Sequence, residues 1–183
     1  RVRRAQEIWK DALPFNGDHP YLQRKRLSLQ HLNAFKRVHS QQVQRYAAGL
    51  EGPCLVFPLS YEGDIKAVQL IDEAGTKRTI GAPKGASFRY GIPLPETPIL
   101  IGEGLATVAS VANGLLGCGY VTAGDWNIDP VITRIRALHK AYNHVDIEFI
   151  VLADIDKNGL PNPKAIKAAA KHRIKVSEAR HVD

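Results

Sequence analysis

The second half of the chain alternates short apolar runs with segments of about a dozen residues that have helical periodicity, and this pattern constrains the fold most. The apolar runs lack the polar alternation of a strand with one face in water, so they are expected to be buried on both faces of a parallel sheet. Strands joined by helices imply right-handed crossover connections. We expect strands at 98–101, 119–123, 146–153 and 174–178, and helices at 105–116, 129–140 and 162–172.

The first fifty residues have a different texture, in which helical patterns prevail. Residues 2–12 place apolar side chains at three- and four-residue spacings, which predicts a helix, and Pro14 ends it. A second amphipathic helix is expected after Ser28, and a short third one over 41–48. This part of the chain is therefore predicted to be small and helical.

Short β-type runs separated by glycine-containing turns follow over residues 54–80. This arrangement is typical of a meander of antiparallel strands. Pro93 and Pro95 cannot continue a central strand, so they predict a linker. We therefore expect a smaller α+β subdomain over residues 1–95 and an α/β domain over residues 96–183.

The composition bounds the class of protein. The chain has 183 residues, 44% of them apolar and 23% charged, as in a soluble globular protein. No apolar stretch reaches the roughly 18 residues that span a bilayer, and residues 1–4 do not lead into a signal-peptide core, so a cytoplasmic location is expected. The absence of Met indicates a piece of a longer polypeptide. Cys54 and Cys118 have no Cys-x-x-Cys pattern, so they are expected to pack as small apolar residues.

The net charge of +7 is uneven along the chain. Residues 1–60 carry 10 lysines and arginines against 4 acids, whereas residues 61–183 carry 15 against 14. A localised basic excess attracts polyanions, while any single basic cluster is explained as well by a solvated surface. Both interpretations remain open for the amino-terminal third.

Two acidic signatures follow apolar runs of the predicted parallel sheet. Glu103 comes after the run at 98–101, and Asp154 and Asp156 come at the end of the run at 147–153. Ligands bind at the carboxyl edge of such sheets, and clustered carboxylates repel one another unless a hard cation such as Mg²⁺ neutralises them. The sequence therefore predicts a metal site there. Two simpler alternatives stay open, an acid in the first turn of a helix for Glu103 and an Asx-type turn after Asp154.

A calcium-binding loop is a competing interpretation of residues 154–159, which read Asp-x-Asp-x-Asn-Gly. Such a loop needs a glutamate at its twelfth position, where this chain has Ala165. It also needs an entering helix, where this chain has the β-type run 147–153. The EF-hand interpretation is therefore excluded.

A dinucleotide-binding loop is a second competitor, because Gly102-x-Gly104-x-x-Thr107 follows a strand and Asp125 follows the next one. The third glycine of that fingerprint is absent. Glu103 would also place a negative charge beside the pyrophosphate, opposing the attraction of a helix N-terminus for phosphate. A nicotinamide-dependent enzyme therefore ranks low.

The order of a Glu-Gly after one strand and an Asp-x-Asp after a later one resembles the Toprim domain shared by bacterial-type primases, topoisomerases and some nucleases. Residues 101–110 are similar to the Glu-Gly-x-Ala-Thr-Ala motif of plasmid- and phage-type primases. Upstream segments resemble the basic subdomain that precedes Toprim in those enzymes, namely residues 19–22 with Arg24 and Lys25, residues 56–59, Gly63, residues 69–71, residues 75–78 and Gly85.

This resemblance implies a Toprim-like α/β catalytic core that copies single-stranded DNA into short RNA primers from ribonucleoside triphosphates, in replication or conjugative transfer of a plasmid, phage or mobile element. It implies Glu103, Asp154 and Asp156 as catalytic residues and as ligands of Mg²⁺ or Mn²⁺. Helicase and zinc-ribbon domains are expected outside this fragment. No association with a membrane is expected. The implied nucleotide- or DNA-binding residues are Lys77, Arg78, Lys84, Arg89, Arg24 and Lys25, for each of which a solubility role remains open.

The chain departs from the wider family four residues after Glu103. Many chromosomal primases and topoisomerases have a further acid there, and this chain has Thr107, in agreement with the plasmid and phage branch. Thr107, Asp125 and Asn127 are candidates for lining the site, although Asp125 and Asn127 are explained as well by capping the next helix. A Toprim nuclease or topoisomerase-like enzyme and a non-catalytic nucleic-acid-binding module remain as alternative functions.

Overall fold

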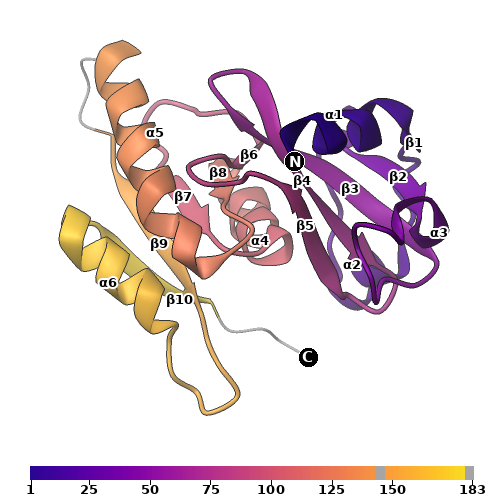
Figure 1. Ribbon diagram of the computed structural model, residues 1–183. Helices are drawn as coiled ribbons and strands as arrows, with labels where there is room; N and C mark the ends of the chain where they lie inside the picture. Colours follow the sequence, from indigo (N-terminus) through magenta and orange to yellow (C-terminus); the bar gives the residue numbers. More distant parts are fainter. Residues whose placement is uncertain (143–146, 180–183) are drawn as a thin grey trace. The chain divides into compact units, whose positions relative to one another are not determined.

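The computed structural model describes residues 1–142 and 147–179, and the chain forms two compact units, Arg1–Phe88 and Arg89–Asp183. Each unit is built on its own five-stranded sheet with flanking helices (Figure 1). The first sheet is antiparallel, and the second is formed mainly by parallel strands. The predicted class, an α/β unit preceded by an α+β unit with an antiparallel meander, is confirmed. The division follows Phe88, whereas the sequence placed a boundary after residue 95.

The sheet of the first unit has the order β1-β2-β3-β4-β5, and each strand is antiparallel to its neighbour. The meander expected from residue 54 accounts for the last three strands. The first two were not predicted, because they are short and pair with residues far along the chain, as when Lys36 lies opposite Val56. The strands are β1 (Leu13–Pro14), β2 (Lys36–His39), β3 (Pro53–Tyr61), β4 (Asp64–Asp72) and β5 (Lys77–Gly81).

The helices of this unit agree with the sequence at the start and differ later. The helix expected over residues 2–12 is α1 (Val2–Asp11), and the expected third helix is shorter, α3 (Ser40–Val43). The prediction of an amphipathic helix after Ser28 is wrong. The chain has a single 3-10 turn there, and the buried ring of Phe35 then packs against Phe57 and Phe88, which commits the following residues to β2. The short helical segments are α2 (Pro20–Arg24) and η1 (Leu32–Ala34).

One apolar cluster joins α1 to a face of the first sheet. Ala5 and Ile8 of α1 pack against Val56, Val68 and Leu70 of the two central strands. Apolar residues at three- and four-residue spacing on the helix thus meet residues at two-residue spacing on the strands. The cluster is completed by Val43, Ala47, Leu50, Cys54 and Ile80.

The sheet of the second unit has the order β10-β9-β7-β8-β6, and β10, β9, β7 and β8 run parallel to one another. The predicted alternation of strands and helices is confirmed within the described residues. β6 was not predicted and lies just before the expected linker, while residue 146, the first of the expected third strand, lies outside the described residues. The elements are β6 (Phe88–Tyr90), β7 (Ile99–Gly102), α4 (Leu105–Leu115), β8 (Cys118–Val121), η2 (Asp125–Asn127), α5 (Ile128–Tyr142), β9 (Phe149–Asp154), α6 (Pro163–His172) and β10 (Lys175–Ala179).

The parallel sheet is covered on both faces, as its apolar strands require. Ile99 and Ile101 of β7 pack in one cluster with residues of α5 and α6, which lie side by side in Figure 1. On the other face, Val108 of α4 approaches the strands very closely. A side chain at Gly119 would place its Cβ 2.4 Å from Val108 Cγ1, and one at Gly102 would lie 2.9 Å from Val108 Cγ2. The two glycines therefore let α4 pack directly on the sheet.

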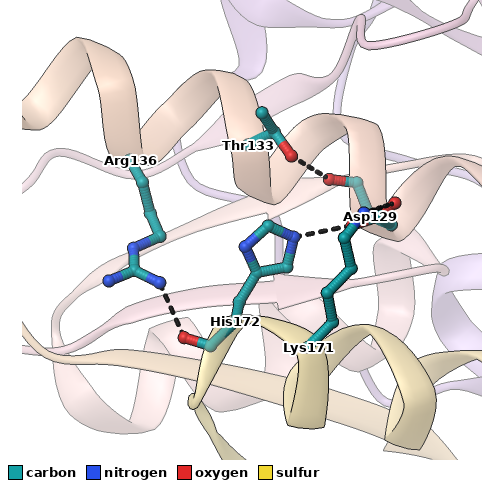
Figure 2. A network of polar contacts seen from close by, with 5 residues as sticks. All are labelled: Asp129, Thr133, Arg136, Lys171 and His172. Atoms are coloured by element: carbon teal, nitrogen blue, oxygen red, sulfur yellow. Dashed lines mark hydrogen bonds and ion pairs between the residues drawn. The ribbon is translucent and has the colours of Figure 1, made fainter.

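A network of polar contacts holds α5 and α6 together (Figure 2). The carboxylate of Asp129 accepts from Lys171 Nζ at 2.8 Å and contacts His172 Nε2 at 2.6 Å. Arg136 Nη1 donates to the carbonyl of His172 at 2.6 Å, so the end of α6 is bonded to two positions along α5. The hydrogen bond from Lys171, followed by that from His172, lowers the pKa of Asp129.

Both cysteines are buried, as the sequence predicted. Burial raises the pKa of the Cys54 thiol to about 12 and that of Cys118 to about 11, so neither forms a reactive thiolate near neutral pH. Among the described residues, no helix is both long and apolar enough to cross a membrane.

Candidate acidic site at the carboxyl edge of the parallel sheet

Three neighbouring strands of the second unit, β9, β7 and β8, end at one edge of the sheet. Gly102 at the end of β7 lies opposite Val121 of β8 and Leu152 of β9. Glu103 follows Gly102 directly, and Asp154 lies two residues beyond Leu152. The structure therefore brings Glu103 and Asp154 to the same edge on adjacent strands.

The backbone around Glu103 is bonded to the loop that follows β8. The carbonyl of Gly102 accepts from the Thr122 amide at 2.9 Å, and the carbonyl of Glu103 accepts from the Ala123 amide at 3.1 Å. The parallel hydrogen bonding thus continues past the ends of the two strands. Since both sides of the acidic residue are tied to a neighbouring segment, its position at the edge is well defined, and its side chain is half-buried.

The side chain of Asp154 is oriented by α4. The hydroxyl of Thr107 donates to Asp154 Oδ1 at 2.8 Å, and Thr107 is only 5% exposed. The backbone of Asp154 is also bonded, because its carbonyl accepts from the Asn162 amide at 2.9 Å. Thr107, which the sequence indicated as a lining residue, therefore contacts one of the predicted ligands.

Asp156 is exposed and turned toward its own loop. Its Oδ1 accepts from the amides of Asn158 at 2.8 Å and Leu160 at 3.0 Å, while its own amide donates to the Leu160 carbonyl at 2.9 Å. The backbone hydrogen bonds, from Leu160 first and then Asn158, lower its pKa. This is the Asx-type arrangement that the sequence left open.

The two polar residues of the β8–α5 turn occupy different environments. Asp125 accepts from Lys164 Nζ at 2.9 Å and from Asn162 Nδ2 at 3.4 Å, and its pKa is lowered, chiefly by Lys164. Asn127 is fully buried, and its Nδ2 donates to the Thr122 carbonyl at 2.9 Å. Asp125 therefore lies at the edge and is paired with a lysine, whereas the buried side chain of Asn127 stabilises the turn by bonding to its backbone.

Sequence reasoning missed three residues of this edge, Trp126, Asn162 and Lys164. Asn162 is the N-cap of α6, and its Oδ1 accepts from the Lys164 amide at 2.9 Å. An Asn-Pro pair before a helical pattern is a signal for such a cap. The contact of Lys164 with Asp125 spans 39 residues, which no local pattern reports.

The donor set at this edge suits a hard cation only in part. Within residues 1–142 and 147–179, no group of three or more His, Cys, Asp or Glu residues is arranged to hold a metal ion. Glu103 and Asp154 are carboxylates on adjacent strands, while Asp156 is engaged in its own turn. Mg²⁺ is commonly held by one or two protein carboxylates, waters and the phosphates of a substrate. The residues therefore fit an ion that arrives with a phosphate ligand rather than a closed protein cage.

The predicted basic residues fall into two groups. Two arginines of the first unit bond to backbone carbonyls, since Arg24 donates to the carbonyl of Glu73 and Arg78 Nε donates to that of Ala48 at 3.0 Å. These guanidinium groups therefore stabilise loops of the first unit. The second group is Lys25, Lys77, Lys84 and, in the second unit, Arg89. All four side chains are exposed to solvent, as are the two arginines.

No protein family and no curated protein matches the sequence. Among solved structures, the chain is similar to the primase fragment of the bacteriophage T7 primase-helicase protein, with 16% identity and a TM-score of 0.49, over 94% of this chain and 67% of that chain. It is also similar to a chain in a structure of the bacteriophage T7 lagging-strand DNA polymerase interacting with primase domains of two gp4 subunits bound to an RNA/DNA hybrid and dTTP. That match has 18% identity and a TM-score of 0.41, over 83% of this chain and 78% of the other.

Proposed function

We propose that this chain is the catalytic core of a DNA primase, which synthesises short RNA primers on single-stranded DNA in the replication or transfer of a plasmid, phage or mobile element. One observation carries the proposal: Glu103 and Asp154 lie at the ends of adjacent parallel strands, and Thr107 of the motif after Glu103 is bonded to Asp154. The Glu-Gly-x-Ala-Thr motif thus has a physical link to the Asp-x-Asp motif. The proposal rests on these residues and on their resemblance to the Toprim pattern.

In the proposed reaction, the 3′-hydroxyl oxygen of one ribonucleotide bonds to the α-phosphorus of the next, the bond to the bridging oxygen breaks, pyrophosphate leaves, and the hydroxyl proton passes to solvent. When bound, Mg²⁺ or Mn²⁺ supplies positive charge that stabilises the leaving phosphates. Glu103 and Asp154 supply anionic oxygens for it, and Thr107 holds Asp154 in one orientation. Asp156 would join them through its other carboxylate oxygen, because its Oδ1 accepts from the amides of its loop.

The exposed basic side chains of the chain would attract the template and the nucleotide through their phosphates. Lys77 and Lys84 are the better candidates of the first unit, because the guanidinium groups of Arg24 and Arg78 already bond to carbonyls. A cytoplasmic location, and helicase and zinc-ribbon domains in the complete polypeptide or in a partner, belong to the same proposal.

A primer-synthesis assay tests the proposal directly. The protein is incubated with single-stranded DNA, ribonucleoside triphosphates and Mg²⁺ or Mn²⁺, and short RNA products are expected. Glu103→Gln and Asp154→Asn each remove a charge at the edge and are expected to lower the yield at least as much as the roughly 10- to 100-fold loss seen when a group supporting a metal site is removed. Glu148→Gln is the matched control, because Glu148 precedes β9 at the opposite edge of the same sheet and pairs there with Lys175.

Two results would overturn the proposal. The first is the absence of RNA products from the wild-type protein at high concentration, and the second is equal yield from the wild type and both site variants. Metal-dependent cleavage or relaxation of DNA in the same mixtures would instead support a Toprim nuclease or topoisomerase-like enzyme. Binding of single-stranded DNA with no product of any kind would support a non-catalytic module.

A further inference from the structure

A large aromatic side chain is left in solvent at the candidate acidic edge. Trp126 lies in the turn between β8 and α5, directly after Asp125, and is 50% exposed. An indole is among the side chains that gain most from burial, and exposed Trp is enriched where proteins bind ligands or partners. The exposure of Trp126 at the candidate acidic edge therefore indicates that its side chain binds something there.

The turn that carries Trp126 is closely bonded on both sides. Thr122 Oγ1 donates to the Gly124 carbonyl at 3.0 Å, and the Asn127 amide donates to the same carbonyl at 3.1 Å. The amide of Trp126 itself donates to the carboxylate of Asp125. The backbone that positions the indole is thus held by side-chain and main-chain groups of the same turn.

The indole itself packs on this turn. A Cβ at position 124 would lie 2.7 Å from Trp126 Nε1 and 3.2 Å from Cδ1, so only glycine leaves room for the ring. One side of the indole is therefore supported by the backbone at Gly124, while half of the side chain remains open to solvent. A supported, half-open aromatic ring is a surface on which a second flat ring can stack.

The turn is also joined to the acidic residue that the proposed chemistry uses. The amide of Ala123 donates to the Glu103 carbonyl at 3.1 Å. Trp126 is three residues further on, so its Cα lies at most about 11 Å from that of Ala123. The indole is therefore close enough to be reached by the base of a nucleotide whose phosphates lie near Glu103.

We propose that Trp126 is a stacking platform for a nucleobase bound at this edge, either the base of a ribonucleoside triphosphate or a base of single-stranded DNA. The inference rests on the proposed function and adds the residue that binds the base. Stacking on an aromatic ring suits a primase substrate because every base has a π-face, so the contact tolerates any sequence. Polar groups adjoin the ring, since Asp125 precedes it and Lys164 is bonded to Asp125, whereas protein-docking surfaces usually need a contiguous apolar patch.

Fluorescence of a single tryptophan tests the stacking without any polymerisation. The chain has two tryptophans, and Trp9→Phe leaves Trp126 as the only one. Three probes are added in turn to this full-length variant: ATP with Mg²⁺, an oligothymidylate, and an abasic oligonucleotide of the same length and charge. We expect ATP, the oligothymidylate or both to quench the fluorescence of Trp126. The abasic oligonucleotide is expected to leave this fluorescence unchanged. Quenching by ATP assigns the site to the nucleotide, and quenching by the oligothymidylate assigns it to the template.

Affinity measurements on substituted chains provide the second test. From the usual strength of base–aromatic stacking, Trp126→Leu is expected to weaken binding of the base-carrying probe by about 5-fold or more and to leave binding of the abasic probe unchanged. Trp126→Phe retains a ring and is expected to keep most of the affinity. Leu138→Ala is the matched control, because it also removes an exposed apolar side chain. Leu138 lies on α5, about 15 Å from the start of that helix and so away from Trp126.

The stacking proposal is overturned if no base-carrying probe quenches the Trp9→Phe variant, or if Trp126→Leu binds every probe as the wild type does. Equal loss for abasic and base-carrying probes would also overturn it, since a general change in the protein would then explain the effect. A shift from dimer to monomer in Trp126→Leu, with unchanged binding, would identify a protein interface instead. Quenching of the Trp9→Phe variant without primer synthesis by the wild type would contradict the proposed function and leave the stacking proposal intact. Full primer synthesis by Trp126→Leu, with no quenching of the Trp9→Phe variant, would contradict the stacking proposal and leave the proposed function intact.

Discussion

The two sheets of this protein have the same number of strands and distribute their polar side chains in opposite ways. In the antiparallel sheet of residues 1–88, successive strands end at alternate edges, so the turns between them are spread over both. In the parallel sheet, β7, β8 and β9 all end at one edge, where Glu103 follows β7, Asp125 follows β8 and Asp154 ends β9. Parallel topology thus brings carboxylates to one edge, whereas an antiparallel meander distributes its turns over two.

The charged residues of the two units differ in the same sense. Arg24 and Arg78 in the first unit bond to carbonyls of its loops, and Asp72 accepts from the amides of Glu51 and Thr76. These contacts stabilise the turns of the meander. In the second unit, Thr107 and Lys164 donate to the carboxylates of Asp154 and Asp125 at the edge, in addition to the contacts that Asp156 makes with amides of its own loop.

The packing of α4 on the parallel sheet offers the largest expected effect on stability. Gly119→Val places a Cβ 2.4 Å from Val108 Cγ1 and 3.2 Å from Leu100 Cβ, so the helix must move or the strand must bend. We expect a loss of about 3 kcal/mol in the free energy of unfolding, measured by urea denaturation. Amide hydrogen exchange should increase in residues 89–142 and 147–179.

The matched change in the first unit is Gly63→Ala. Gly63 lies in the tight turn between β3 and β4 with open space around it and a φ of 87°, so only backbone strain opposes the substitution. We expect a loss of about 1 kcal/mol. A larger loss for Gly63→Ala than for Gly119→Val would contradict the view that close helix packing distinguishes the parallel sheet.

The contact between Thr107 and Asp154 is expected to affect activity more than stability. Thr107→Val keeps the shape and removes the hydroxyl, so Asp154 loses the donor that orients it. We expect primer synthesis to fall about 10- to 100-fold and the free energy of unfolding to fall by about 1 kcal/mol. Thr107→Ser restores a hydroxyl and should restore most of the activity. Equal activity of the valine and serine variants would show that the hydroxyl does not position Asp154.

The two groups of basic residues in the first unit can be separated by alanine substitution. Arg78→Ala removes hydrogen bonds to the carbonyls of Ala48 and Lys77, and we expect it to destabilise the protein by about 1 kcal/mol in thermal denaturation. Lys84→Ala is expected to change stability by less than about 0.5 kcal/mol. Its effect should appear in binding of single-stranded DNA: the slope of log affinity against log salt concentration is expected to become less steep by about 1. An unchanged salt slope for Lys84→Ala would remove that residue from the binding surface.

The smallest expected effect is a pH dependence of the α5–α6 contact in the second unit. Because the pKa of Asp129 is lowered in the folded state, its contribution to stability is present above the unfolded value of about 3.9 and is lost as the pH falls through the folded value. The carboxylate is 39% exposed and Lys171 62%, so we expect less than about 1 kcal/mol. The measurement is urea denaturation at several acidic pH values. Asp129→Asn should abolish this part of the pH dependence, and an identical pH profile for the variant would contradict the assignment.

Much of the fold could be predicted because the relevant signals are local. Helix α1 and the strands and helices after residue 96 are each visible in the periodicity of their own residues. β2 and β6 were missed because a strand of three or four residues has too few positions for a pattern and is formed by its partner. The helix expected after Ser28 failed for a related reason, since the burial of Phe35 depends on rings 22 and 53 positions further along the chain.

The sequence by itself determined that Glu103 and Asp154 would lie at one edge, because strand direction follows from the alternation of strands and helices. Only the tertiary structure decided what each side chain there contacts. Thr107 meets Asp154 across 47 residues, Lys164 meets Asp125 across 39, and Asp156 turns to the amides of its own loop. The physical reason is that periodicity reports which face of an element is buried, whereas a hydrogen bond depends on how closely helices and loops pack on the sheet.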